Sequence, residues 1–524
     1  MSTTSASRWR DSLAVFADRR VLIMLFLGFS AGIPILLIFS SLSLWLGEAG
    51  VERSAVTFFS WAALGYSFKF VWAPLIDEIP VPILTRLLGR RRSWLLVAQC
   101  MVIAAIVCMA MTDPLQGDAA LVQMAMSAVL LGFSAATQDI VIDAYRIELA
   151  DTKYQTALAA TYNAGYRIGM IVAGAGALFL ASSLGSEKGS YVYAAWQTTY
   201  LVMAASMLIG VVTTLVVREP ERSKPPRPWA GVDYFRLVLV FMVSIAGFVL
   251  AFMQLGGWLP EIENSPFLMF GVEAIRFLSS GVVAVLVGYG LVSAGVVNRE
   301  MAYQTWVEPL KDFFNRYGVK SALLLLALIG LYRISDIVAG VISNVFYQDM
   351  GFTKAEIATA VKTFGVLMTI VGGFMGGLLA QRFNVTKILM LGAILASATN
   401  LLFIQVAYAG HDLFWMYLAV TADNLASGLA GAAFVAFLSS LTSVSFTAVQ
   451  YAIFSSLMTL IPKVLGGYSG SIVTGVGYPA FFTMTTLMGL PVLVLVVLVQ
   501  RQFALRQGAD QAALVDLDKP LSKE

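Results

Sequence analysis

The chain has 524 residues, of which 59% are hydrophobic and only 12% charged, and its mean hydropathy is +0.80. Soluble globular domains carry about 25% charged residues, so most of this chain must lie in lipid. The net charge is only +3, and the 34 lysines and arginines are spread over short segments between apolar runs, which argues against nucleic-acid binding.

The first part of the chain contains six apolar runs that are long enough to cross a membrane, which takes about 20 helical residues. They lie at 21–46, 54–76, 93–111, 119–142, 156–181 and 195–217. The first run is much longer than the apolar core of a cleaved signal peptide, which has about 7 to 15 residues, so we interpret it as a retained membrane helix. Residues 1–217 are therefore predicted to form an N-terminal six-helix bundle.

A charged, proline-rich break at 218–228 is followed by two more candidate spans, at 235–254 and 271–297. The segment 305–318 is too polar to span, and the spacing of its large apolar residues predicts a helix along the cytoplasmic surface. We therefore expect 218–320 to hold a basic linker, two extra transmembrane helices and an amphipathic helix. Without the extra pair the chain would have twelve spans; we predict fourteen.

Six further apolar runs complete the chain, and they predict a C-terminal six-helix bundle over 321–500 with a tail over 501–524. They lie at 321–346, 357–381, 387–409, 412–437, 446–464 and 478–500. Two groups of six helices divided by a linker are typical of an all-α polytopic membrane protein built from two parallel halves. Basic residues collect in alternate loops, which places both termini and the tail in the cytoplasm.

Several charged residues fall inside the predicted spans, where a charge costs at least about 2.5 to 3.5 kcal/mol on insertion scales. Such side chains usually face a bundle interior or a water-filled cavity. Arg167, Arg333 and Asp423 fall near mid-bilayer, whereas Lys69, Asp336 and Lys362 lie nearer one side. For Lys69, Asp336 and Lys362, a structural ion pair and a place in a cavity wall both remain open.

Asp139, Asp143 and Arg146 are spaced to share one face of a helix. Two carboxylates beside a base form a group whose protonation can change with conformation, so we predict proton coupling at Asp139 and Asp143. The alternative is a structural ion pair between Asp143 and Arg146 at the cytoplasmic rim.

The loop after the second predicted span contains Asp77 and then Gly89 with Arg90, Arg91 and Arg92. It resembles the acidic and Gly-Arg-rich loop that major facilitators carry between their second and third helices, with an insertion at 78–88. Ion pairs between a helix-end carboxylate and guanidinium groups can hold a face closed in one state and release it in another. We predict a cytoplasmic gate here; the alternative is simple positive-inside topology.

Cysteine and histidine are too rare for metal or thiol chemistry. The two cysteines, Cys100 and Cys108, lie in one apolar run, and we expect both to be buried. The single histidine, His411, excludes a multi-histidine metal site. We expect no metal, no cofactor and no enzymatic activity.

Several segments together resemble the AmpG-type muropeptide permeases of Gram-negative bacteria, which are major facilitators. The most specific are 28–34 (GFSAGIP), 66–74 (YSFKFVWAP) and 136–146 (ATQDIVIDAYR), followed in the second half by 332–336, 362–365, 433–438 and 446–452. The resemblance implies a monomeric permease of the bacterial inner membrane that imports GlcNAc-1,6-anhydroMurNAc and its peptides with protons, for peptidoglycan recycling. The resemblance also implies that this import feeds the signal that induces a beta-lactamase.

Under this resemblance we expect a substrate cavity lined by basic, acidic and amide side chains. Its expected members are Lys69, Gln138, Arg167, Arg333, Asp336, Lys362, Asp423 and Gln450. Three rival functions remain. A carrier of another bulky anion, such as an acyl-CoA-like compound, would use the same cations. A membrane-embedded enzyme of wall-precursor metabolism would need a nucleophile with a base or a metal cluster. A scaffold has little reason to keep mid-bilayer charges.

Overall fold

A computed structural model describes residues 14–51, 64–187, 189–221, 229–258 and 266–517. The chain divides into two compact units, each described by itself. The first comprises 1–73, 80–221 and 314–524, and the second comprises 74–79 and 222–313. The described residues are almost entirely helical, with one isolated bridge between Glu187 and Ser190.

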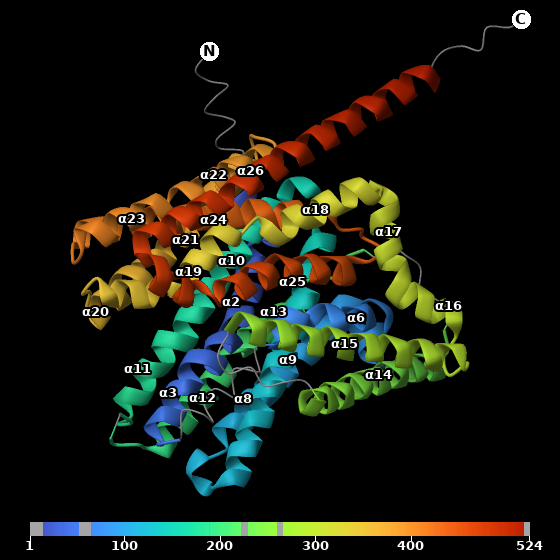
Figure 1. Ribbon diagram of the computed structural model, residues 1–524. Helices are drawn as coiled ribbons and strands as arrows, with labels where there is room; N and C mark the ends of the chain where they lie inside the picture. The colour runs from blue at the N-terminus through green and yellow to red at the C-terminus, as the bar shows by residue number, and fades with distance from the viewer. Residues whose placement is uncertain (1–13, 52–63, 188, 222–228, 259–265, 518–524) are drawn as a thin grey trace, which may run out of the picture. The chain divides into compact units, whose positions relative to one another are not determined.

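The N-terminal half of the first unit runs through the helices drawn from blue to green in Figure 1. Its long helices are α2 (Arg19–Leu36) with α3 (Leu42–Glu48), α8 (Arg90–Ala110), α9 (Asp118–Leu149), α10 (Gln155–Ile171) with α11 (Ala177–Ser183), and α12 (Tyr193–Ser206) with α13 (Leu208–Val216). Between α3 and α8 lie the short helices α5 (Leu64–Phe68), η4 (Lys69–Val71), α6 (Ala73–Glu78) and α7 (Leu84–Leu88).

The C-terminal half of the first unit runs from yellow to red in Figure 1. Its helices are α18 (Val319–Leu331), α19 (Ile334–Asp349), α20 (Lys354–Ile357) with η9 (Ala358–Phe364), α21 (Gly365–Ala380), α22 (Val385–Ala398), α23 (Asn400–Ala409), α24 (Leu413–Leu441), α25 (Thr447–Gly466) and α26 (Ser469–Leu517). Gly477 interrupts α26 with φ +79°, so the predicted final span at 478 begins where the helix breaks.

Thirteen helices among the described residues are long and apolar enough to cross a membrane. They confirm the all-α polytopic fold and include both helices of the predicted extra pair, so the larger span count is confirmed over the smaller. The remaining predicted span, 54–76, lies partly outside the described residues, and its described part forms α5, η4 and most of α6.

Glycines let pairs of helices approach until their backbones touch. A Cβ on Gly165 of α10 would lie 2.0 Å from the carbonyl oxygen of Leu25 on α2, and one on Gly28 of α2 would lie 2.2 Å from that of Tyr162. In the C-terminal half, a Cβ on Gly372 of α21 would lie 2.2 Å from the carbonyl oxygen of Leu425 on α24. Close packing of this kind fixes the helices that carry the polar residues described below.

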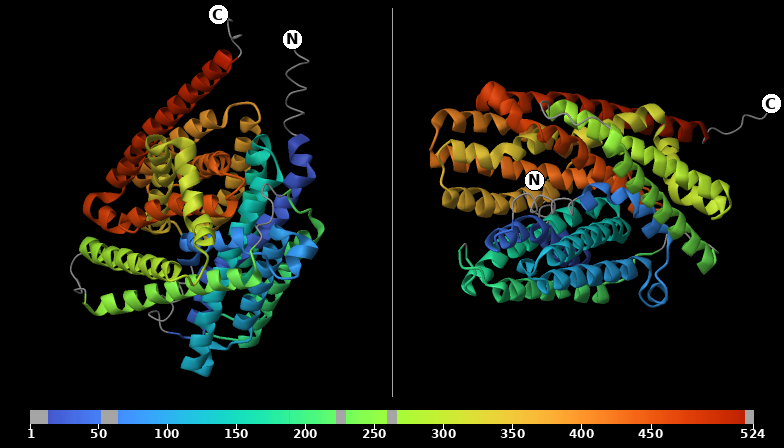
Figure 2. Two further views of the ribbon diagram at one scale, coloured as in Figure 1. Left: turned by 90° about the vertical axis from the view of Figure 1, so that its right-hand side faces the viewer. Right: turned by 60° about the horizontal axis from the view of Figure 1, so that its bottom comes forward.

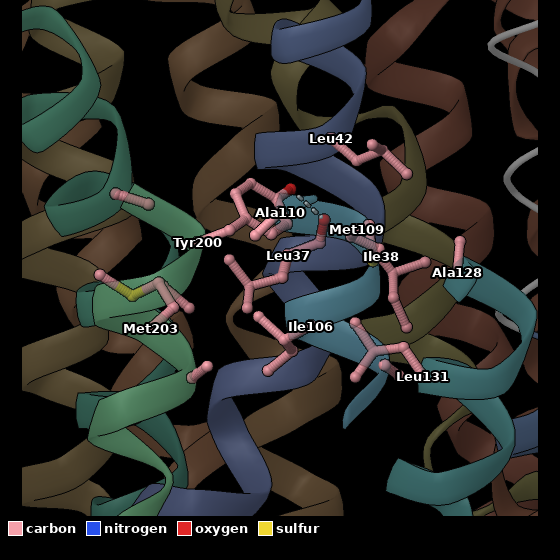
Figure 3. Close-up of a cluster of buried hydrophobic side chains, with 14 of the residues drawn as sticks. Leu37, Ile38, Leu42, Ile106, Met109, Ala110, Ala128, Leu131, Tyr200 and Met203 are labelled. Carbon is pink, nitrogen blue, oxygen red and sulfur yellow. Dashed lines mark hydrogen bonds between the residues drawn. The ribbon is translucent and has the colours of Figure 1, made fainter. Parts of the chain in front are cut away.

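The core of the N-terminal half is apolar and mostly aliphatic. Figure 3 shows Leu37, Ile38 and Leu42 packed against Ile106 and Met109 of α8, with further contacts from α9 and α12. The Tyr200 hydroxyl of α12 donates a 3.0 Å hydrogen bond to the carbonyl of Leu37, in the π-helical turn η2 (Leu37–Ser41). That bond satisfies a hydroxyl which burial would otherwise penalise.

The two cysteines of α8 lie on its outer face. Cys100 and Cys108 are exposed, so the prediction that both are buried was wrong. A continuous apolar run does not reveal which face of a helix meets lipid, because lipid-facing and core-facing positions are both apolar.

The second unit contains the extra helix pair, α14 (Gly231–Trp258) and α15 (Pro266–Ser293), which lie side by side in Figures 1 and 2. Arg276 of α15 joins them: its Nε donates to the carbonyl of Phe252 at 2.8 Å, and its guanidinium stacks on the Phe252 ring. After α16 (Arg299–Ala302), the segment 305–318 that was predicted to be amphipathic forms the end of η8 (Tyr303–Val307) and α17 (Glu308–Tyr317), where Phe313 is buried.

Candidate functional site

A polar cavity of about 310 Å³ lies between the two halves of the first unit. The N-terminal half contributes residues of α10, and the C-terminal half contributes residues of α21 and α24 together with the break before α19. Its polar lining includes Asn163, Tyr166, Arg167, Arg333, Thr369 and Ser427. Two of the predicted cavity residues, Arg167 and Arg333, are therefore brought together although 166 residues separate them in sequence.

Arg167 is a half-buried cation without a counterion. Among the described residues it has no hydrogen-bond acceptor or carboxylate partner, and the charge it faces across the cavity is that of Arg333. Like charges in a site of low dielectric repel each other, so this pair favours an anion between or beside them. Backbone contact at Gly165 and Gly169 fixes the position of α10 and hence of Arg167.

Arg333 sits where the predicted span 321–346 breaks into α18 and α19. Its Nε donates to Asp336 Oδ2 at 3.0 Å, and its Nη2 donates to the same oxygen and to Ser427 Oγ at 3.0 Å. Asp336 Oδ1 is buried and has no partner among the described residues. Asp423 lies on α24, one turn before Ser427, and accepts from Thr399 Oγ1 at 3.3 Å.

A second polar cluster lies in the N-terminal half, between η4 and α9. Lys69 Nζ is 3.6 Å from Asp143 Oδ2, and Arg146 Nη2 is 3.4 Å from Asp143 Oδ1. Asp139, one turn earlier, instead accepts from the hydroxyl of Tyr162 at 3.2 Å. The structural ion pair considered from sequence is therefore present at Asp143, while Asp139 is the carboxylate of this cluster without a direct ion pair in the described part of the chain.

One end of the first unit is held closed by ion pairs, and we call it the arginine-rich end: Arg90, Arg91, Arg146, Glu148 and Thr447. Glu148, at the end of α9, accepts from Arg91 Nη2 at 2.6 Å and lies 3.4 Å from Arg90. Arg91 also donates to Thr447 Oγ1 at 2.9 Å, and Thr447 bonds Glu148. Since Thr447 begins α25, these bonds join the two halves.

Arg146 adds a second link between the halves. It is completely buried; its Nη1 donates to Ser439 Oγ of α24 at 2.9 Å and to Gln155 Oε1 at 3.0 Å. Its guanidinium also lies over the ring of Tyr451, 5.1 Å from the centroid. At the opposite end, α3 and α11 stand apart from α20 and α23 in Figure 1.

The Gly-Arg loop begins α8 and is tied to Glu219. The carboxylate of Glu219 accepts from the backbone N–H groups of Arg91 and Arg92 at 2.8 and 3.0 Å, which caps the helix. Gly89 has φ +91°, and a Cβ there would lie 2.4 Å from Glu219. Arg92 donates to the carbonyls of Thr214 and Leu215. Asp77, the predicted gate carboxylate, lies in the second unit.

The chain matches the family model of the Major Facilitator Superfamily over residues 21–332. It is 30% identical over 491 residues to the anhydromuropeptide permease of Escherichia coli strain K12, covering 94% of this chain and 81% of that protein. It is also 29% identical to "Putative transporter AmpG 4" of Rickettsia conorii, covering 91% and 96%. The solved structure of FucP, a major facilitator transporter in the outward conformation, aligns with a TM-score of 0.58 at 10% identity over 92% and 99% of the two chains.

This chain is an AmpG-type member of the major facilitator superfamily. The resemblance stated from its motifs is thereby confirmed, and the protein is a multi-pass membrane transporter rather than an enzyme. Within this AmpG-type transporter, both halves line the central cavity, and the hydrogen bonds at the arginine-rich end join one half to the other.

Three other predicted site residues of this AmpG-type transporter lie outside the clusters described above. Gln138 is completely buried, and its Nε2 donates to Ser30 Oγ between α9 and α2. Gln450 is buried near the start of α25, where its Oε1 accepts from Arg316 at 2.8 Å and from the N–H of Ser443 at 2.8 Å. Lys362 is exposed on η9.

Sequence reasoning missed several functional candidates. Glu148 and Thr447 were overlooked because each lies at a helix end, where a polar residue is ordinary. Tyr162 and Ser427 were missed because they are uncharged, and the search for polar residues inside apolar runs was based on charge. One signal was available: Glu148 falls two residues beyond Arg146, at the rim where the basic loop meets the membrane.

Outside the spans, the single histidine joins two loops at the end opposite the arginine-rich end. His411 Nε2 lies 3.0 Å from Glu356 Oε2. The N–H and hydroxyl of Thr353 also donate to Glu356, at 2.7 and 2.9 Å. The Thr353 backbone bond, followed by the His411 contact, lowers the pKa of the Glu356 carboxyl below its ordinary value.

Proposed function

We propose that this transporter imports muropeptides, GlcNAc-1,6-anhydroMurNAc and its peptides, from periplasm to cytoplasm by alternating access, driven by protons, for peptidoglycan recycling. The observation that carries the proposal is the pair of guanidinium groups, Arg167 and Arg333, lining one cavity between the halves. Muropeptides carry several carboxylates, and an unpaired arginine binds a carboxylate with charge-assisted, bidentate hydrogen bonds. The E. coli relative named anhydromuropeptide permease supports this cargo.

The arginine-rich end is assigned to the cytoplasm. Basic residues in alternate loops support this orientation, with both termini inside and the protein in the bacterial inner membrane. On this assignment, Glu148, Arg91 and Thr447 seal the cavity from the cytoplasm, as an outward-facing state requires. Of the predicted gate residues, Arg90 and Arg91 would then act through Glu148, and Arg91 and Arg92 through Glu219. The role of Asp77 in the gate stays a prediction.

Proton coupling is assigned to Asp139 and Asp143 of α9. Asp143 contacts Lys69 and Arg146, and Arg146 contacts Ser439 and Tyr451 across the halves. A change of charge at this carboxylate pair would therefore act directly on a bond that closes the cytoplasmic end. The imported muropeptides would supply the signal for beta-lactamase induction, and the transporter would work as a monomer.

The remaining residues predicted for the substrate cavity divide by place. Arg333 and Asp336 form one cluster with Asp423 one turn from the cavity-lining Ser427, and we keep all three in the proposed substrate region. Lys69 belongs with the carboxylates of α9. Gln138, Lys362 and Gln450 stay predictions that flux measurements on single variants can test.

The deciding experiment measures flux of labelled anhydromuropeptide into proteoliposomes holding the full-length protein. We expect accumulation with an inward proton gradient, and little in Arg167→Met. Lys463→Met, which removes an exposed lysine near the end of α25, is the matched control and should accumulate cargo like the unaltered protein. If an acyl-CoA-like anion is transported and muropeptide is not, the proposed cargo is wrong. If muropeptide flux does not depend on the proton gradient, the proposed proton coupling is wrong.

A further inference from the structure

The two buried polar clusters of the first unit carry different charge balances. In the N-terminal cluster, Lys69 and Arg146 offset Asp139 and Asp143, so the four groups sum to zero when all are ionised. In the C-terminal cluster, Arg333 faces two carboxylates, Asp336 and Asp423, and the sum is one negative charge. Net charge in a site of low dielectric is costly, so the second cluster depends on a compensating charge.

That compensating charge is Arg167. It faces Arg333 across the cavity and has no carboxylate of its own among the described residues. With Arg167 included, the empty cavity is neutral while Asp423 is ionised. A substrate carboxylate that binds Arg167 uses up this positive charge and returns the C-terminal cluster to a net negative charge.

Asp423 is the member of the cluster placed to respond. Asp336 Oδ2 accepts two hydrogen bonds from the guanidinium of Arg333, whereas the neighbour that bonds Asp423 is the neutral hydroxyl of Thr399. The other ionisable groups recorded as interacting with Asp423 are Arg333, Asp336 and Tyr347. The further cations on elements that contact α24 are Arg146, Lys153, Arg167, Lys362, Lys387 and Lys463, and none forms an ion pair or hydrogen bond with Asp423 in the described part of the chain.

Asp423 and Asp139 also lie on opposite sides of the cavity cations along the bundle. Counting about 1.5 Å per helical residue from the arginine-rich end, Asp139 is about 15 Å deep, Arg167 about 18 Å and Asp423 about 27 Å. Asp423 is thus the carboxylate nearer the opposite end, which the proposed orientation assigns to the periplasm.

We propose that Asp423 takes up a proton when a substrate carboxylate binds at Arg167 and Arg333. The proton comes from water on the open, periplasmic side, adds to a carboxylate oxygen of Asp423, and leaves again when the anion departs. Cargo binding itself thereby loads one proton at Asp423, separate from the coupling proposed for Asp139 and Asp143 of α9. This inference rests on the proposed function, because the bound anion is a carboxylate of the cargo.

The test measures binding and proton exchange together on the purified full-length protein in a weakly buffered solution. Anhydromuropeptide is added and the pH change is followed with an indicator dye. The unaltered protein should take up protons as it binds, and its affinity should fall by up to about tenfold per pH unit as pH rises, the limit for one linked proton. Binding without proton uptake overturns this inference alone; absence of binding overturns the cargo as well.

Variants locate the proton. Asp423→Asn should bind without proton uptake and with an affinity that no longer depends on pH, whereas Asp423→Glu should restore uptake. Asp139→Asn should still take up the proton on binding, because the C-terminal cluster is intact. Asp412→Asn, the same change at the cap of the same helix, should behave like the unaltered protein. Normal uptake by Asp423→Asn, or its loss in Asp139→Asn, overturns the assignment.

Discussion

The arginine-rich end and the central cavity are both polar places buried between the two halves, yet they are built in opposite ways. At the arginine-rich end each carboxylate meets several donors: Glu148 accepts from Arg90, Arg91 and Thr447. In the cavity, Arg167 has no acceptor among the described residues, and Asp336 keeps one oxygen unpaired. Charged groups that are paired within the protein stabilise one conformation, whereas a charged group without a counterion is available to a charged ligand.

This contrast separates stability from transport. Removing a partner at the arginine-rich end leaves a buried charge unpaired and should cost stability. Removing the cavity cation Arg167 breaks no hydrogen bond or ion pair among the described residues, so stability should hold while binding fails. Substitutions in the two places should therefore differ in how much they change stability and how much they change binding.

Glu148→Ala should have the largest effect on folding. It removes the carboxylate that lies 2.6 Å from Arg91, a side chain only 1% exposed, and losing one partner of a buried pair costs about 3 to 5 kcal/mol. Thermal and denaturant unfolding measure the loss. Glu221→Ala removes an exposed carboxylate near the same end and is the control. Equal stability of the two variants would mean that the Glu148 contacts do not hold the halves together.

Arg167→Met should weaken muropeptide binding by about 10- to 150-fold, since a hydrogen bond to a charged group contributes about 1.5 to 3 kcal/mol. Its unfolding temperature should stay unchanged, because Arg167 has no hydrogen bond or ion pair among the described residues and protonation of Asp423 restores a neutral cavity. Isothermal titration calorimetry and thermal unfolding on one preparation provide both values. A drop in stability as large as that of Glu148→Ala would contradict the contrast between the two places.

Gly165→Ala should disturb the cavity through the backbone. The new methyl would meet the carbonyl of Leu25 at 2.0 Å, so α2 and α10 must separate, at about 1 to 3 kcal/mol for an overpacked site. Arg167, two residues on, moves with the helix, so binding should fall as well. Gly176→Ala is the matched control, because its nearest atom lies at 3.8 Å. Unchanged binding in Gly165→Ala would show that the close packing does not position Arg167.

The membrane helices and the cavity cations could be predicted from sequence, because each depends on a local property. An apolar run long enough to span is a helix in lipid, where every backbone group must be bonded internally. Arg167 and Arg333 stood out because a charge in such a run has few reasons to be there. The prediction of one continuous helix over 54–76 missed the local structure, since the described part of this range divides into three short helices.

The partners of the charged residues could not be predicted, because they depend on contacts between distant parts of the chain. Glu148 and Thr447 are 299 positions apart, and no local pattern pairs them. Gln138 and Gln450 were chosen because they lie in motifs, and a motif does not say which face of a helix meets a cavity. The partner of Glu356, by contrast, could be predicted from sequence, because the Thr353-x-x-Glu356 spacing is that of a capping box.

Glu356 should show the smallest effect, because its contacts are local and exposed. Its lowered pKa means that the ionised carboxylate is favoured in the folded protein, so its contribution is present above the ordinary pKa and is lost as pH falls through the lowered one. The protection factors of the amides at 353–357 against hydrogen exchange, corrected for the intrinsic pH dependence of exchange, should therefore fall on acidification, and Glu356→Gln should remove that change. Muropeptide transport at neutral pH should not change in this variant. If transport did change, the segments joined by Glu356 and His411 would take part in transport. The contrast between paired charges that stabilise the protein and unpaired charges that bind cargo would then fail at this end of the protein.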